Sequence, residues 1–231
     1  MKIRIKFAKY GAMKFIGHLD MMRFFQKAIR RAGIDIRYSE GFSPHQIMSF
    51  AAPLGVGIES SGEYMDIEVL SMTSTEDMKE ALNQVMVEGV EVLSVSVLPD
   101  NAKNAMASVA AASYRIKVKE EVFSFIDLYG QLRDFYGQER IPYTKETKKS
   151  VAELDLKQGI YEIEADADGS IRMLVNASSS GNIKPTMVFE KFCEFVGVEI
   201  LRSDYQVTRL DIYTDLAKEG EKHQFVPLAS A

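Results

Sequence analysis

The order of secondary-structure signals in the first 98 residues limits the fold more than any other feature of the chain. Ile3, Ile5 and Phe7 alternate with charged residues, which is the period-2 pattern of a strand with one buried face. Further signals follow for a helix, two strands, a second helix and a last strand, over residues 18–32, 47–52, 63–70, 74–88 and 90–98. This β-α-β-β-α-β order is typical of a ferredoxin-like domain, in which two helices cover one face of a four-stranded antiparallel sheet.

The second half of the chain repeats this order with longer insertions. Residues 99–111 are small and polar and predict a linker. The expected elements after it are a strand at 114–118, a helix at 121–136, a hairpin that turns at 166–169, a helix from Pro185 and a strand at 200–213. We therefore expect an α+β protein made of tandem ferredoxin-like (βαββαβ) domains at 1–98 and 112–214, followed by a loose tail at 215–231.

The distribution of apolar residues limits which class of protein this is and in which cell compartment it is expected. The longest apolar run is interrupted by Pro and Gly and falls far short of the roughly 18 residues that a membrane span needs, so we expect no membrane contact. The N-terminus alternates charged and apolar residues where a signal peptide requires a continuous apolar stretch, which predicts a cytoplasmic protein. The one cysteine, Cys193, has apolar neighbours at helical spacing and is expected in the core.

Charge is distributed unevenly along a chain whose formal net charge is -5. Residues 1–48 contain ten lysines and arginines against three acids, whereas residues 49–100 contain one lysine against ten acids. A basic segment in an acidic protein indicates a site for an anion such as a phosphate backbone. The alternative is that the basic and acidic segments lie side by side and neutralise each other.

The densest group of polar, aromatic and basic side chains lies between residues 17 and 57. Its candidate substrate-binding residues are His18, Asp20, Arg23, Lys27, Arg30, Arg31, Tyr38, Ser39, Phe42 and His45. His18 is expected in the first turn of the helix, near backbone N–H groups that can bind phosphate. Asp20 has a simpler explanation, because an acid in the first turn favours the helix dipole. Likewise, residues 39–44 have the composition of ordinary turns.

Several of these residues form motifs that resemble those of the radical-SAM-linked proteins, a bacterial family without an assigned reaction. The motifs are GHLDMMR at 17–23, RAGID at 31–35, YSEGFSPH at 38–45 and PLGVG at 53–57, with weaker similarity at 155–156 and 181–185. Gly17 stands where the family usually has serine, which removes a hydroxyl cap. Family members are typically encoded beside a radical SAM protein or fused to its C-terminal end, often near genes for RNA processing. The resemblance thus implies a radical SAM partner and an RNA setting.

Two functions fit these observations. In the first, the protein is a non-catalytic accessory module that binds RNA or another phosphate-bearing substrate through its basic and aromatic side chains. In the second, it is a metal-independent endoribonuclease in which His18 and His45 act as acid and base. A metal site built from His18, Asp20, Glu40 and His45 is chemically conceivable, but their spacing does not indicate one. We expect no metal and no cofactor, because the chain lacks the cysteines of an iron–sulfur cluster.

Overall fold

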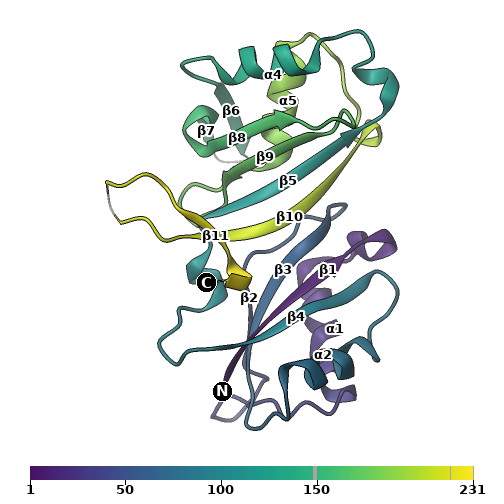
Figure 1. The fold of residues 1–231 in the computed structure, drawn as a ribbon, viewed down its shortest axis with the longest axis vertical. Coiled ribbons are helices and arrows are strands. Elements are labelled where there is room, and N and C mark those ends of the chain that lie inside the picture. Colours follow the sequence, from purple (N-terminus) through teal and green to yellow (C-terminus); the bar gives the residue numbers. More distant parts are fainter. Residues whose placement is uncertain (148–149, 219, 231) are drawn as a thin grey trace. The chain divides into compact units, whose positions relative to one another are not determined.

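The fold was analysed in a computed structural model that describes residues 1–147, 150–218 and 220–230. The chain has a mixed α+β fold in which most strands belong to a large, mostly antiparallel sheet (Figure 1). It divides into two compact units, which are described separately below. Unit 1 comprises Met1–Val109 and Asp211–Ala231, and unit 2 comprises Ala110–Leu210. The tandem ferredoxin-like arrangement predicted from the sequence, with its two four-stranded sheets, is not confirmed as such.

Unit 1 contains the elements predicted for the first 98 residues. They are β1 (Lys2–Lys9), α1 (His18–Arg31), β2 (Met48–Phe50), β3 (Glu59–Glu68), α2 (Thr75–Asn83) and β4 (Val90–Leu98), with a 3-10 helix at Gly11–Phe15. β1 pairs antiparallel with both β3 and β4, and β2 pairs antiparallel with β3. The strand order is therefore β4-β1-β3-β2.

The main core of unit 1 lies between these strands and the two helices. Ile3, Ile5 and Phe7 of β1 are almost completely buried. They pack in one cluster with the buried stripes of α1 and α2, which consist of Met21, Phe25, Ile29, Met78 and Leu82. Burial of a stripe at this spacing stabilises each helix by tertiary packing. Ser74 caps the start of α2, where its hydroxyl accepts a hydrogen bond from the Asp77 N–H.

The end of the chain is not a loose tail, so this expectation is corrected. β11 (Phe225–Pro227) pairs with Tyr213–Asp215 at the end of β10 (Tyr205–Asp215). Leu228 is completely buried in a second core cluster of unit 1. A strand partner and an apolar anchor fix this segment. Positions 219 and 231 lie outside the described residues.

Unit 2 supplies the remaining elements. They are β5 (Ala111–Val118), α4 (Leu128–Tyr136), β6 (Pro142–Thr147), β7 (Ser150–Asp155), β8 (Ile160–Ala165), β9 (Ile171–Asn176), α5 (Pro185–Phe195) and β10 as far as Leu210. The strand order is β10-β5-β9-β8, and β6 and β7 pair separately. A short helix, α3 (Ala105–Ser108), lies in the segment predicted as a linker.

Two features of unit 2 differ from the sequence prediction. The helix expected at 121–136 begins only at Leu128, because the Asp127 carboxylate accepts a hydrogen bond from the Gly130 N–H and so caps the helix there. Phe125, which lies within the range predicted as helix, is 74% exposed. By contrast, Cys193 lies in the core as expected, and burial raises the pKa of its thiol to about 12.

A membrane-spanning helix is not found in the part of the chain that the structure describes, since none of its helices is both long and apolar enough.

Candidate nucleic-acid interface

Helix α1 presents four basic side chains on its outer face. Its buried stripe of Met21, Phe25, Ala28 and Ile29 faces the sheet. Arg23, Lys27, Arg30 and Arg31 are all exposed. Because they lie at positions i, i+4, i+7 and i+8, they share one side of a helix with 3.6 residues per turn. The spacing of the apolar residues therefore determines where the cations lie.

Only one of these four cations is paired with a carboxylate among the described residues. Arg23 contacts Asp20 at 3.1 Å, and both side chains are more than half exposed. The Arg30 Nε donates to the backbone oxygen of Gln26 at 3.2 Å, and the Arg31 guanidinium donates to that of Val85 at 3.1 Å. Exposed ion pairs contribute little, so this face keeps its positive charge for an anionic ligand.

The second part of the site is a closed loop formed by residues 38–46, here called the aromatic loop. Ser39 and His45 close it through a backbone hydrogen bond of 2.8 Å and through two contacts of the Ser39 hydroxyl, to the His45 N–H at 3.1 Å and to the His45 Nδ1 at 2.9 Å. Gly41 has a φ of 109°, a left-handed conformation that favours glycine. Phe42 is fully exposed beside it, and Tyr38 is 44% exposed.

A shared hydrogen-bond acceptor joins the aromatic loop to the basic face of α1. Gln46, at the base of the loop, donates through Nε2 to the Gln26 backbone oxygen at 3.2 Å. This is the same oxygen that accepts from Arg30. One acceptor therefore serves both the basic stripe, through Arg30, and the base of the aromatic loop, through the buried Gln46. The Gln46 Oε1 is buried and has no hydrogen-bond partner among the described residues.

The two predicted histidines have different local surroundings. His18 begins α1 and packs edge-on against Phe50, with ring centroids 5.3 Å apart. His45 lies in the aromatic loop, and residues 46–50 between it and Phe50 run in an extended conformation. Five extended residues span about 16 Å between the Cα atoms of His45 and Phe50, so His45 belongs to the opposite end of this segment from the Phe50 ring that His18 contacts.

His18 instead lines a small cavity with two charged residues that the sequence analysis missed. Lys9 and Glu63 are 2% and 4% exposed, and the cavity between them and His18 has a volume of about 20 Å³. The Lys9 ammonium donates to the Ile16 backbone oxygen at 2.6 Å, just before α1 begins. A cavity of this size holds about one water molecule. Strand parity could have revealed both residues, because each falls on the inward-facing register of its strand.

Among the described residues, the histidines and carboxylates considered as metal ligands do not form a metal site. In the described ranges, no three His, Cys, Asp or Glu side chains are grouped so that they could hold a metal ion.

Comparisons with known proteins place the chain in a family but give no activity. A family model described as "Uncharacterized protein conserved in bacteria (DUF2344)" matches residues 2–185, so the chain belongs to this family. No curated protein matches. Among solved structures, the chain is similar to one titled "X-ray crystal structure of a heavy metal efflux pump, crystal form II", with 8% identity and a TM-score of 0.23. The match covers 90% of this chain but 28% of that chain, and a likeness this low carries no argument.

Proposed function

We propose that this member of the bacterial DUF2344 family is a non-catalytic accessory protein that binds single-stranded RNA on the surface formed by α1 and the aromatic loop. The observation that carries the proposal is the Gln26 backbone oxygen shared by Arg30 and Gln46. It connects the helix that carries the row of cations to the base of the loop that carries the exposed aromatic rings. Proteins that bind single strands combine these same two elements, with cations along the backbone and aromatic faces on which bases stack.

Each part of the surface has a distinct task in this proposal. Lys27, Arg30 and Arg31 contact phosphates. Phe42 and Tyr38 stack on bases, and the Ser39–His45 closure holds their loop in place. Since the whole chain has a net charge of -5, attraction of RNA depends on this local concentration of positive charge.

Fluorescence anisotropy with labelled single-stranded RNA, measured over a range of salt concentrations, tests the proposal. Replacing Arg30 and Arg31 by alanine is expected to weaken binding and to reduce the magnitude of the salt slope by about 1.4, which corresponds to about 0.7 for each lost phosphate contact. Phe42→Ala is expected to weaken binding roughly 5- to 100-fold, because one stacked base is worth about 1–3 kcal/mol, with the slope unchanged.

A control uses Arg133→Ala, which removes an exposed arginine from α4 of unit 2. It should leave both the affinity and the salt slope unchanged. The proposal is wrong if RNA binding is absent, or if the control weakens binding as much as the double change at Arg30 and Arg31.

We also propose that the protein works in the cytoplasm with a radical SAM enzyme, as the motifs at 17–57 imply. Such an enzyme would supply the chemistry, and this chain would present the RNA. Co-purification from the native host followed by native mass spectrometry should recover the enzyme with the chain. Recovery of the chain without any such enzyme would refute this partnership while leaving RNA binding to the test above.

We further infer that both units are ferredoxin-like. Unit 1 has the strand order β4-β1-β3-β2 and unit 2 the order β10-β5-β9-β8. When the strands of each unit are numbered along the chain and the β6–β7 hairpin is set aside as an insertion, both orders read 4-1-3-2. This is the order expected for a split βαβ repeat.

A further inference from the structure

A second cavity of unit 1 is large enough for a small molecule. Its volume is about 390 Å³, and it lies between β2, the end of β3 and residues 102–104. Sites for cofactors and small ligands are typically about 300–1,000 Å³. The cavity is separate from the one beside His18, with which it shares no lining residue.

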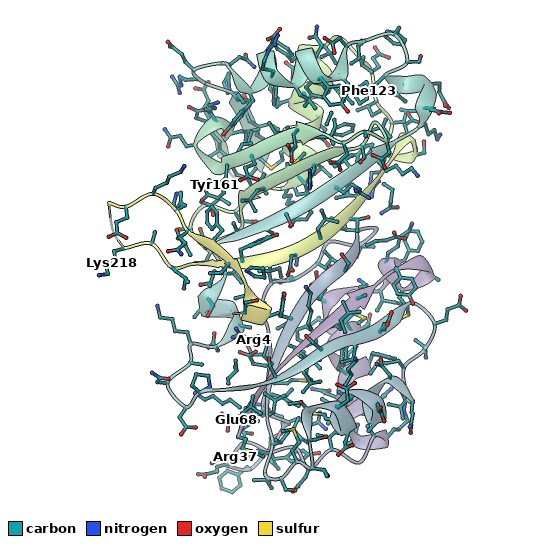
Figure 2. All side chains as sticks on the ribbon, in the orientation of Figure 1. Arg4, Arg37, Glu68, Phe123, Tyr161 and Lys218 are labelled. Atoms are coloured by element: carbon teal, nitrogen blue, oxygen red, sulfur yellow. The ribbon has the colours of Figure 1, made fainter. Side chains whose placement is uncertain are left out.

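Two lysines and two carboxylates line this cavity, and they differ in whether a partner of opposite charge is present. Its two carboxylates already have arginine partners, because Asp66 contacts Arg4 at 2.9 Å and Glu68 contacts Arg37 at 3.3 Å. Figure 2 shows Arg37 and Glu68 next to each other. Its two lysines, by contrast, contact no carboxylate among the described residues. The Lys2 ammonium donates to the Asp100 backbone oxygen at 3.0 Å, and Lys103 is exposed. The cavity therefore favours a ligand with an anionic group.

The remaining walls suit a ligand that also has a flat, partly polar body. Met48 and Leu98 line the cavity with apolar atoms, and a methionine side chain adapts readily to a planar ring. The Ser49 hydroxyl and the Asn104 amide, which also line it, can hydrogen-bond to polar ring edges or to ribose.

The cavity also adjoins the aromatic loop. The Ile47 N–H donates to the Arg37 backbone oxygen at 2.9 Å, and these two residues directly flank the loop of residues 38–46. Ile47 itself lines the cavity. A strand of RNA stacked on Phe42 and Tyr38 would thus lie within reach of the cavity.

We propose that this cavity binds one nucleoside 5′-monophosphate unit, with its phosphate at Lys2 and Lys103 and its base against Met48 and Leu98. This rests on the proposed RNA binding and deepens it, because the unit is one nucleotide of the bound strand. The cavity would hold that nucleotide away from its neighbours, as proteins that present a single base for chemistry do. A free nucleoside monophosphate has the same chemistry and is the second possible source.

The proposal is tested by measuring how the four nucleoside 5′-monophosphates bind to the whole chain. Ligand-observed NMR and titration calorimetry detect this binding. At least one monophosphate should bind more tightly than its nucleoside and more tightly than inorganic phosphate. Replacing Lys2 and Lys103 together by glutamine should weaken this binding about 100-fold or more, because each of the two charge-assisted hydrogen bonds is worth about tenfold or more. Lys79→Gln in α2 is the matched control and should have no effect.

Two further arms separate the possible outcomes. Ala102→Phe fills the cavity and should abolish monophosphate binding, and circular dichroism checks that this variant is folded. Arg30→Ala/Arg31→Ala should weaken RNA binding and leave monophosphate binding intact, so the two sites fail independently. Binding of RNA that is unaffected by Ala102→Phe, together with binding of free monophosphate, would assign the cavity to the free nucleotide. The inference is overturned if no monophosphate binds at millimolar concentration, if phosphate alone binds equally well, or if the double lysine variant binds normally.

Discussion

Replacing Arg4 by methionine should destabilise unit 1 more than any exposed substitution, because its guanidinium joins three separate segments. Arg4 is 3% exposed. It donates to both carboxylate oxygens of Asp66 at 2.9 and 3.1 Å, to the Leu228 backbone oxygen at 3.1 Å and to the Lys103 backbone oxygen at 3.3 Å. Asp66 in turn accepts from the Ala105 N–H at 2.6 Å. One side chain thus ties β3, the start of α3 and the chain end to β1.

The expected loss of stability comes from the polar groups that lose a partner when Arg4 is replaced. Methionine keeps most of the buried volume, so little of the cost comes from packing. The carboxylate of Asp66, 11% exposed, would keep its charge without a cation, and two backbone oxygens would lose their donor. Breaking a buried pair in this way costs about 3–5 kcal/mol. For a chain of this length, that lowers the unfolding midpoint by roughly 6–20 °C.

Thermal and urea unfolding followed by circular dichroism measure the loss, and hydrogen exchange locates it. Exchange should increase at residues 225–230 and 103–108. Arg172→Met provides the control, since Arg172 makes ion pairs of 2.7 and 3.0 Å but is 48% exposed, and it should cost less than about 1 kcal/mol. Replacing Arg4 and Asp66 together by apolar residues should recover most of the stability. A cost below about 1 kcal/mol for Arg4→Met would refute the reasoning.

Three further outcomes are expected. Because burial raises the pKa of the Cys193 thiol to about 12, a disulfide reagent at pH 8 should not modify it until the chain is unfolded in urea; rapid native labelling would contradict its burial. Hydrogen bonds from the Lys119 ammonium and the Leu201 N–H lower the pKa of Asp204. The stability that they supply is present above the unfolded pKa of about 3.9 and is lost as the pH falls through the folded value. Lys119→Met should therefore flatten the decline of the unfolding midpoint below pH 4, and an unchanged decline would count against it. Gly89→Ala should cost about 1–3 kcal/mol, because Gly89 has a φ of 92° and an added Cβ would lie 2.6 Å from the Tyr10 oxygen; an unaltered unfolding midpoint would show that the turn relaxes.

Helices and strands that bury one face could be predicted from the sequence, whereas strands without a buried apolar face were missed. β1 and α1 have apolar residues at period 2 and at helical spacing, and both form the predicted element. The β6–β7 hairpin has no such signal, because its strands are rich in charged and polar residues. The start of α4 was placed seven residues too early, since apolar spacing continues through Phe125 and only the Asp127 cap marks the true beginning.

The candidate site was predictable as a set of residues but not as a surface. Motif and charge pointed to α1 and to residues 38–45, and both segments carry exposed side chains. Their connection runs through Gln46 and the Gln26 backbone oxygen, a contact between residues 20 positions apart. No local pattern encodes such a contact, because it depends on how β2 and α1 pack on the sheet.

Lys9 and Glu63 could have been found from the alternation of inward- and outward-facing residues along their strands. The same alternation predicts how they affect the stability of the fold. Lys9 continues the inward register of Ile3, Ile5 and Phe7, and Glu63 that of Met65 and Ile67. Two opposite charges on the inward faces of paired strands are tolerated only when they compensate each other. Lys9→Met and Glu63→Leu should therefore each lower the free energy of unfolding by about 3–5 kcal/mol, while the double variant should lose less than either. Urea unfolding of the three variants measures this coupling. Strictly additive losses would mean that each charge is stabilised by its own surroundings, and that the cavity beside His18 lies next to two independent buried ions.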